Sequence, residues 1–401
     1  MPPVAEWKIG APESLALGAA AVLIGLWLRA KMPLLAKWSI PAAVAGGMCI
    51  ALVIALLRGR AVNITADSSL RDLLSLVCFT LIGLNASLRV LVRGGAAIPV
   101  MLAVAGLGAA LQNVVGGLAA WSFGLNPLVG ALAGSVALCG GPATSIAFGS
   151  AFEAKGVPGA TSIAVASATF GIAVGGLLAG RLGQWLIEMR GLTGAPAVGA
   201  GSGDGGEVLA PAGSLLSDCL TVSMCIGLGS VLDLLFRAGG LTVPGFIGPM
   251  TVAAIWRNIL DRTGWRLLSE SRLQDIFQAV LPLFIGVAIA TLRLWELSSL
   301  ALPLVGILLI QTVATLLFSA AVFAIFQRIT TPYEGAVMTS GFAGFMLGIT
   351  PNAMASMEEL TRKYGPAPQA FLTVPIVGGY LNDFVNSLIV TASMSMLGLL
   401  H

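Results

Sequence analysis

The chain has 401 residues, of which 57% are hydrophobic and only 10% are charged. Soluble domains carry roughly 25% charged residues, so this composition excludes an ordinary soluble protein and predicts a polytopic membrane protein in a lipid bilayer. The net charge of +3 is small and scattered, which argues against nucleic acid as a partner, and the single histidine excludes a histidine-rich metal centre.

A helix needs about 20 apolar residues to cross a bilayer. By this rule the first part of the chain predicts five spans, near 14–30, 38–57, 70–88, 97–123 and 158–187. An apolar stretch at 126–150 is interrupted by Gly140, Gly141 and Pro142, which a straight membrane helix cannot easily contain. We therefore expect a bend there, in a lined cavity or pathway.

A Gly-rich segment, 191–213, follows and lacks apolar periodicity, so we expect a flexible linker. The pattern then repeats, with an interrupted stretch at 332–358 and five further spans, near 214–236, 241–259, 273–292, 299–326 and 367–399.

The two parts also align residue by residue at a nearly constant spacing. Asp72 pairs with Asp275 before the interruptions, and Pro158 pairs with Pro366 after them. An odd number of spans in each half places the second half in the opposite orientation, which is typical of secondary transporters. The predicted fold is all-α, with two inverted repeats of five transmembrane helices, 1–190 and 214–401, each carrying a re-entrant hairpin.

The distribution of Lys and Arg predicts the orientation, because these residues collect on the cytoplasmic side. Most of the 21 Lys and Arg residues fall in inner loops if the N-terminus is outside. Both termini are then expected outside and the linker in the cytoplasm. The stretch 126–150 would enter from outside and 332–358 from inside, each as two half-crossings of roughly 15 Å, so that their tips meet.

The tips of the two stretches are the predicted substrate site. At each tip the following half-helix presents free N–H groups and the positive end of its dipole, which suits a carboxylate. The alternative is that small residues merely let membrane helices pack closely. The candidate substrate-binding residues are Gly140, Gly141, Thr144 and Ser145 at the first tip, and Gly348, Thr350 and Asn352 at the second.

Asp383 lies within the last apolar span, where a carboxylate costs at least about 2.5 kcal/mol unless it is paired. Asn382 and Asn386 bring amide oxygens close to it, and such hard ligands suit a small cation or a proton better than a soft metal. We predict that these three residues hold a coupling cation. The alternatives are an interhelical hydrogen bond or a water-facing end of the span.

Gln112 and Asn113 in the fourth span, with Gln311 in the ninth, form a symmetric polar pair within apolar sequence. Gln112 and Asn113 are further candidate cation ligands, or else they join helices through their side-chain amides. The chain contains no nucleotide-binding motif and no catalytic set of residues, so we predict that it is not an enzyme and that an ion gradient drives it.

These motifs resemble those of the bacterial sodium/glutamate symporter family. The resemblance rests on Gly140–Gly149, Leu347–Met357 and Phe371–Asn386, and covers nearly the whole chain. It implies sodium-driven uptake of glutamate or a related carboxylate by a homodimer in the bacterial inner membrane. It also implies an elevator mechanism in which the first two spans of each half form a fixed scaffold, with Na⁺ as a coupling ion and not a prosthetic group.

The chain departs from the family pattern at Pro142–Ala143 and at Phe345–Met346, next to the two tips. These changes leave open which carboxylate is carried and whether protons replace sodium. The sequence alone also leaves open an anion channel, which would need no coupling carboxylate.

Overall fold

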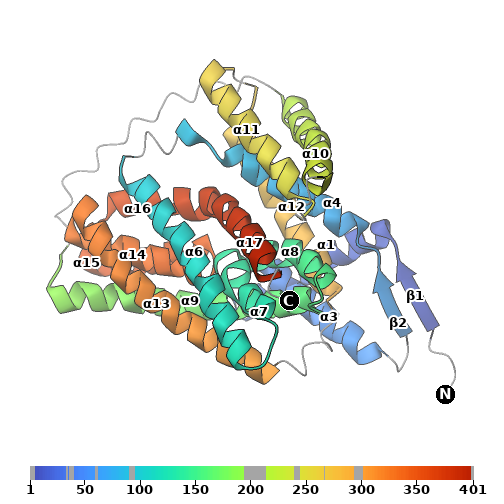
Figure 1. The fold of residues 1–401 in the computed structure, drawn as a ribbon, viewed down its shortest axis with the longest axis horizontal. Helices are drawn as coiled ribbons and strands as arrows, with labels where there is room; N and C mark the ends of the chain where they lie inside the picture. The colour runs from blue at the N-terminus through green and yellow to red at the C-terminus, as the bar shows by residue number, and fades with distance from the viewer. Residues whose placement is uncertain are drawn as a thin grey trace.

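The computed structural model describes residues 5–32, 35, 40–58, 62–89, 95–193, 214–238, 244–265, 267–292 and 301–398, and these are almost entirely helical (Figure 1). The first half contains α1 (Ala11–Lys31), α3 (Ala42–Leu57), α4 (Ser69–Asn85), α6 (Ala97–Ser122), α7 (Pro127–Ala131), a π-helical segment η1 (Leu132–Cys139), α8 (Gly141–Ala154) and α9 (Ala160–Arg190). The predicted linker lies outside the described residues from position 194 onward.

The second half contains α10 (Leu215–Ala238), α11 (Ile247–Thr263), α12 (Glu270–Ala290), α13 (Ala301–Ile329), α14 (Pro332–Leu347), α15 (Thr350–Tyr364), α16 (Pro368–Ile376), a π-helical segment η3 (Val377–Leu381) and α17 (Asn382–Gly398). Six of the described helices, α1, α6, α9, α10, α12 and α13, are long and apolar enough to cross a bilayer.

The last predicted span, 367–399, differs from expectation because it is not one α-helix. It is divided into α16, η3 and α17. Pro375 removes a backbone donor, and Gly378 and Gly379 follow within the π-helical turn. Wide turns of this kind are frequent at functional sites, and this one lies directly before Asn382 and Asp383.

A short parallel pair of strands was not predicted. β1 (Ala5–Ile9) pairs with β2 (Val62–Ala66), with Trp7 opposite Ile64. Each strand is only five residues long, and neither is stable without its distant partner. The pair connects the start of α1 to the segment before α4.

The helices pack into two bundles, seen at the upper right and lower left of Figure 1. The first bundle consists of α1, α3, α4, α10, α11 and α12, in which α1 packs on α3 and α12, and α4 packs on α11. The second bundle consists of α6 to α9 and α13 to α17, in which α14 packs on α9 and α13. Contacts between the bundles run mainly through α8, η3 and α17.

This packing groups more helices together than the expected scaffold contains. The scaffold was expected to contain the first two spans of each half, and the third spans, α4 and α12, pack with those spans as well. The reason is that α12 fits closely against α1, where a Cβ atom on Gly18 would lie 3.1 Å from the Val287 backbone nitrogen. Packing of this kind depends on distant residues, so the spans alone do not reveal it.

Close glycine packing also joins α1 and α3, and it makes a testable prediction. A Cβ atom on Gly46 would lie 1.8 Å from the Ala21 carbonyl oxygen. We expect Gly46→Ala to destabilise the protein by about 1–3 kcal/mol, because the helices must separate. The measurement is thermal unfolding of the purified protein in detergent. The matched control is Gly227→Ala on α10, where the added Cβ atom would have no neighbour within 4 Å outside its own helix backbone. Equal melting temperatures for the two variants would refute this account of the contact.

The interrupted stretches lie where the sequence predicts them. The first bends at Gly140 and Gly141, and the second at Gly348 and Ile349. The first also leaves helical geometry at Gly134 (φ −97°, ψ −124°), which was not predicted. The helices after the bends continue to Ala154 and Tyr364 and so exceed the predicted ends at 150 and 358, because their final turns carry polar residues that hide the helix in a hydropathy plot.

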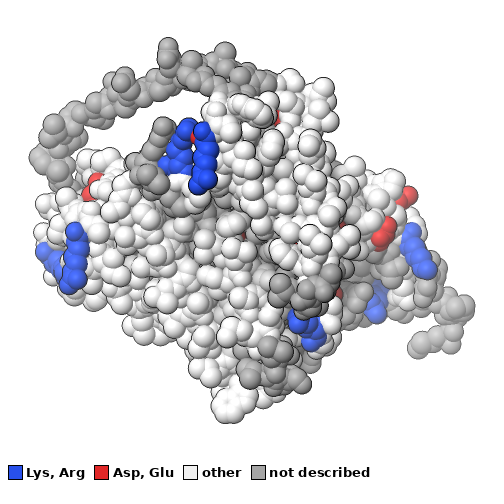
Figure 2. Space-filling model, turned by 45° about the horizontal axis from the view of Figure 1, so that its top comes forward, with Lys and Arg blue, Asp and Glu red and all other residues white. Residues whose placement is uncertain are grey.

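Charged side chains are sparse on the surface. Figure 2 shows a face that is mostly uncharged, with Lys and Arg in a few small groups. At the C-terminal ends of α9, α13 and α15, Arg190 donates to Gln327 (2.9 Å) and Lys363 pairs with Glu188 (3.1 Å). An uncharged belt with charges at helix ends is what a bilayer requires.

Candidate substrate and cation site

The tips of the two interrupted stretches lie against each other in the second bundle. Gly141 begins α8 with φ +66°, a conformation that favours glycine. A Cβ atom there would lie 3.0 Å from Ile349 Cγ2 and 3.9 Å from the Gly348 carbonyl oxygen. The two bends therefore lie next to each other in the described part of the chain.

The helix starts within these stretches differ in their capping. Where each stretch begins, a side chain caps the helix: Asn126 Oδ1 accepts from Leu128 N (2.9 Å), and Thr331 Oγ1 accepts from Glu334 N (3.2 Å). At the tips, the residues directly before α8 and α15, Gly140 and Ile349, provide no side-chain cap. No side chain therefore caps the first-turn N–H groups at the tips, although Pro142 and Pro351 contribute none, and the positive helix ends attract an anion.

The polar side chains at the tips fall into two groups. Ser145 Oγ donates to the Ala164 carbonyl oxygen (3.2 Å) and Thr350 Oγ1 to that of Gly378 (2.7 Å), so both position the tips. Asn352 Nδ2 donates to the Ile172 carbonyl oxygen (2.7 Å), while its Oδ1 is buried without a partner. Thr144 is buried, and its hydroxyl makes no hydrogen bond to any described residue. Thr144 and Asn352 therefore keep capacity for a ligand.

Two side-chain amides of α17 bind η1, the part of the first interrupted stretch before its bend. Asn386 Nδ2 donates to the Ser135 carbonyl oxygen (3.0 Å), and Asn382 Nδ2 donates to Cys139 Sγ (3.2 Å). The amide oxygens of both asparagines, and the Ser135 hydroxyl, are buried without partners. Because Cys139 directly precedes the Gly140–Gly141 bend, α17 contacts the chain immediately before the first tip.

Asp383 lies beside these amides at the start of α17. It is half-buried, near Cys139 and Tyr380, and forms no hydrogen bond through its carboxylate and no ion pair with any described residue. Within the described residues no three His, Cys, Asp or Glu side chains gather as a metal site. A cation here would meet one carboxylate and neutral oxygens, a set that suits a hard ion such as sodium.

The remaining predicted residues lie where α6 and α13 cross. Asn113 Oδ1 accepts from Ser135 N (3.3 Å), and its Nδ2 donates to Ser393 Oγ (3.0 Å), so both ends of this amide are used. Gln112 Nε2 donates to the Met346 carbonyl oxygen (2.8 Å), and Gln311 Nε2 donates to that of Gln112 (2.7 Å). Gln112 and Gln311, which the sequence analysis described as a symmetric polar pair, are therefore in direct contact.

Several buried side-chain amides in this region have one end without a hydrogen-bond partner. The partner at the other end shows that the end without a partner is the oxygen. For Gln112, Gln311, Asn352 and Asn386, the other end of the amide faces a backbone carbonyl oxygen. Only nitrogen can donate to that atom, so the atom without a partner must be oxygen. Each such oxygen costs about 1–3 kcal/mol if it stays unpaired. Their concentration in this region indicates a binding site for a ligand that donates hydrogen bonds or carries positive charge.

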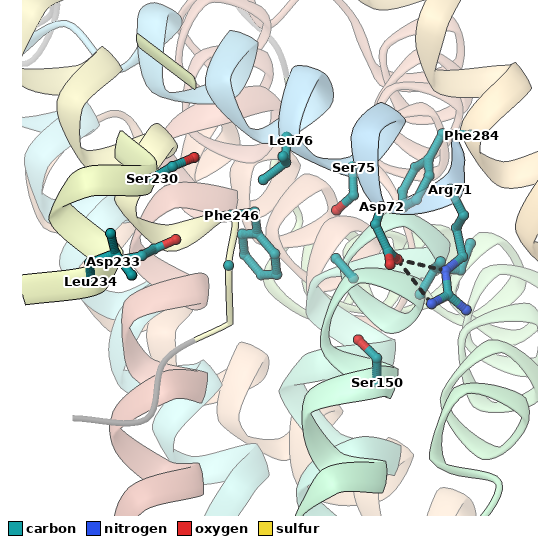
Figure 3. Close-up of a pocket in the computed structure, with 13 residues that line it drawn as sticks. Arg71, Asp72, Ser75, Leu76, Ser150, Ser230, Asp233, Leu234, Phe246 and Phe284 are labelled. Atoms are coloured by element: carbon teal, nitrogen blue, oxygen red, sulfur yellow. Dashed lines mark hydrogen bonds and ion pairs between the residues drawn. The ribbon is translucent and has the colours of Figure 1, made fainter. Parts of the chain in front are cut away.

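Two pockets lie between the bundles, at opposite ends of α4. One, of about 420 Å³, is lined by residues of α4, α8 and α10; in it Arg71 pairs with Asp72 (2.9 Å), and Ser75 and Ser150 point into the space between their helices (Figure 3). The other, of about 530 Å³, lies where α4 ends and reaches α17 on both sides of Asp383, at Leu381, Phe384 and Val385. Phe246 stacks edge-on against Phe148 of α8 (5.0 Å between ring centroids), at the wall of the first pocket.

Comparison with known proteins decides the family. The family model described as sodium/glutamate symporter matches residues 7–366. The sodium/glutamate symporter of Escherichia coli strain K12 is 35% identical over 379 residues, which is 92% of this chain and 93% of that protein. The chain belongs to the sodium/glutamate symporter family. The sodium/glutamate symporter of Haemophilus influenzae is 32% identical over 400 residues, or 97% of this chain and 98% of that protein.

Family membership confirms the resemblance seen in the motifs. Relatives in the sodium/glutamate symporter family are named as transporters, so this member is not an enzyme, as expected. Together with the six long apolar helices, membership makes the chain a multi-pass membrane protein.

The structure also places at this site two residues that the sequence analysis did not propose as ligands, Ser135 and Gln311. The backbone N–H of Ser135 donates to Asn113, the Ser135 carbonyl oxygen accepts from Asn386, and Gln311 contacts Gln112. Gln311 was recognisable as the repeat partner of Gln112, so its role had a sequence signal. Ser135 had none, because a serine in a small-residue stretch is indistinguishable from a packing residue.

Proposed function

We propose that this member of the family is a sodium-coupled glutamate transporter that works by an elevator mechanism. The observation that carries the proposal is the match to sodium/glutamate symporters over nearly the full length of the chain. The arrangement of the tips and of the unpartnered oxygens supports it, because it offers donors for carboxylates and acceptors for cations within one bundle.

The substrate would lie between the tips. The uncapped starts of α8 and α15 would receive carboxylate groups through backbone N–H donors and the positive helix ends. Asn352 Oδ1, which is buried and unpaired, would accept from the α-ammonium group. The Thr144 hydroxyl would complete the carboxylate contacts. No buried arginine is needed in this scheme.

The sodium ion would lie at the start of α17, held by Asp383 with the free oxygens of Asn382 and Asn386. The Ser135 hydroxyl, on the segment that Asn386 already contacts, would be a further ligand. A cation at this position would fix η1 against α17, and η1 leads directly to Gly140. Sodium binding would thereby set the first tip in its substrate-binding geometry, which couples the two events through one rigid connection.

The elevator part of the proposal rests on the two bundles. The second bundle carries all the proposed ligands, the first bundle carries none, and a pocket lies at each end of their interface. Movement of the second bundle past α4 would open the site to one pocket and then to the other. We further propose inverted repeats with re-entrant hairpins, residence in the bacterial inner membrane with both termini outside, and a homodimer held by the first bundle.

The test of the substrate site uses Thr144→Val and Asn352→Leu, which keep volume but remove polar groups. We expect each to weaken glutamate binding about tenfold or more, because an unpaired partner in a dry site costs about 1–3 kcal/mol. The measurement is glutamate binding to purified protein by calorimetry in sodium buffer.

Thr339→Val is the matched control for these variants. The Thr339 hydroxyl is equally buried but donates only to the Gly335 carbonyl oxygen of its own helix (2.8 Å). We expect it to bind glutamate normally. Unchanged affinity in both tip variants would mean that the tip residues only allow close helix packing and that glutamate binds elsewhere.

A further inference from the structure

A second group of unpartnered oxygens lies apart from α17, at the crossing of α6 and α13. Gln112 is 3% exposed and Gln311 is fully buried, and the Oε1 atoms of both lack hydrogen-bond partners. Gln112 Nε2 donates to the Met346 carbonyl oxygen (2.8 Å) and to Thr315 Oγ1 (3.0 Å). Gln311 Nε2 donates to the Gln112 carbonyl oxygen (2.7 Å) and, more weakly, to that of Gly130 (3.5 Å). The two amides are thus held rigidly by their nitrogens.

Each glutamine reaches across to an interrupted stretch in the other half of the chain. Gln112 satisfies the carbonyl of Met346, one residue before α14 ends at Leu347. Gln311 approaches the carbonyl of Gly130, four residues before the non-helical Gly134, where the helical partner of that carbonyl is lost. Carbonyl groups at a helix C-terminal end carry partial negative charge. The surroundings of both amides therefore favour a cation.

This location is separate from the proposed sodium position at α17. Gln112 and Asn113 are neighbours on α6 but bind different elements, since Gln112 contacts α13 and α14 whereas Asn113 contacts Ser135 and Ser393. Two amide oxygens cannot satisfy each other, because both only accept hydrogen bonds. A group that satisfies either oxygen must donate a proton or carry positive charge.

We propose that Gln112 Oε1 and Gln311 Oε1 are ligands of a second sodium ion, completed by backbone carbonyls at the end of α14. The inference rests on the proposed sodium-coupled transport and specifies it further: two sodium ions accompany each glutamate. The ion at α17 holds the approach to the first tip, and the ion at the glutamine pair holds the approach to the second tip. Both tips are then set only when both ions are bound.

The test needs no variant for its first part. In proteoliposomes, the ratio of sodium to glutamate flux is measured from the reversal potential, and the sodium dependence of glutamate binding is fitted for cooperativity. We expect a flux ratio of about two and a Hill coefficient approaching two. A flux ratio of one would overturn the second site while leaving sodium-coupled transport intact, whereas sodium-independent glutamate flux would refute the proposed function itself.

The second part replaces Gln311 with Lys, whose ammonium donates to the same carbonyls and occupies the cation position permanently. We expect Gln311→Lys to bind glutamate with a Hill coefficient for sodium of about one and to lose part of the thermal stabilisation that sodium gives the parent. The control, Ser319→Ala, removes a buried hydroxyl of α13 that donates only to the Thr315 carbonyl oxygen (2.7 Å), and it should keep the parent's sodium response. A folded Gln311→Lys with unchanged sodium cooperativity would mean that the oxygens hold water, and would overturn the proposal.

Discussion

The variant Asp383→Asn is expected to lose concentrative uptake of glutamate while it remains folded. Asp383 is half-buried, and its carboxylate makes no hydrogen bond or ion pair with the described residues, so no structural bond is broken. Asn keeps the shape but removes the negative charge that would face the sodium ion. A charge about 4 Å from the ion is worth several kcal/mol, so the apparent sodium affinity should fall about 100-fold or more. The sodium dependence of labelled glutamate uptake measures this loss.

Asp72→Asn serves as the control for Asp383→Asn. The Asp72 side chain is 56% exposed and pairs with Arg71 on the first bundle, which carries none of the proposed ligands. Exposed pairs contribute at most about 1 kcal/mol, so uptake should change little. If Asp383→Asn accumulates glutamate with the sodium dependence of the parent, Asp383 is a structural residue and the cation site must be built from other oxygens.

Locking the two bundles together is expected to abolish transport while binding persists. Phe277 of α12 and Tyr380 of η3 meet across the bundle interface, with ring centroids 5.7 Å apart. In the double variant Phe277→Cys/Tyr380→Cys, with the exposed Cys49 and Cys219 replaced by serine, a short bifunctional thiol reagent should join the bundles. Because the second bundle could then no longer slide, glutamate flux should fall to background, and reduction of the cross-link should restore it.

The single-cysteine variants treated with the same reagent control for damage at each position. Glutamate binding by the cross-linked protein should remain, since the proposed ligands all belong to the second bundle. Full transport through a completely cross-linked protein would contradict relative movement of the bundles and would place the motion within the second bundle alone.

Much of the helix pattern was predictable, because long apolar runs and glycine breaks act locally. Gly140 and Gly348 marked the bends correctly. The bend at Gly134 was not predictable from the sequence, since a lone glycine among apolar residues usually continues the helix, and its geometry depends on Gln311 packing beside it. The π-helical turn before Asn382 was missed for a similar reason: hydropathy does not distinguish it from an α-helix.

The candidate site was predictable as residue types but not as a network. Asp383, Asn382 and Asn386 stood out as polar residues in an apolar span, yet the sequence could not say that the two asparagines donate to η1 and keep their oxygens free. Asn113 illustrates the converse, because both ends of its amide are engaged. Such partners come from elements far apart in the chain, so they emerge only when the helices are packed.

The central claim, sodium-coupled transport of glutamate, is tested most directly with purified protein in proteoliposomes. Labelled glutamate is supplied outside, with an inward sodium gradient or with equal sodium on both sides, and choline replaces sodium as a further control. We predict accumulation above the external concentration only with the inward gradient, and collapse of the accumulated glutamate when a sodium ionophore is added. Equal uptake under all conditions, or uptake that follows a proton gradient instead, would contradict the account.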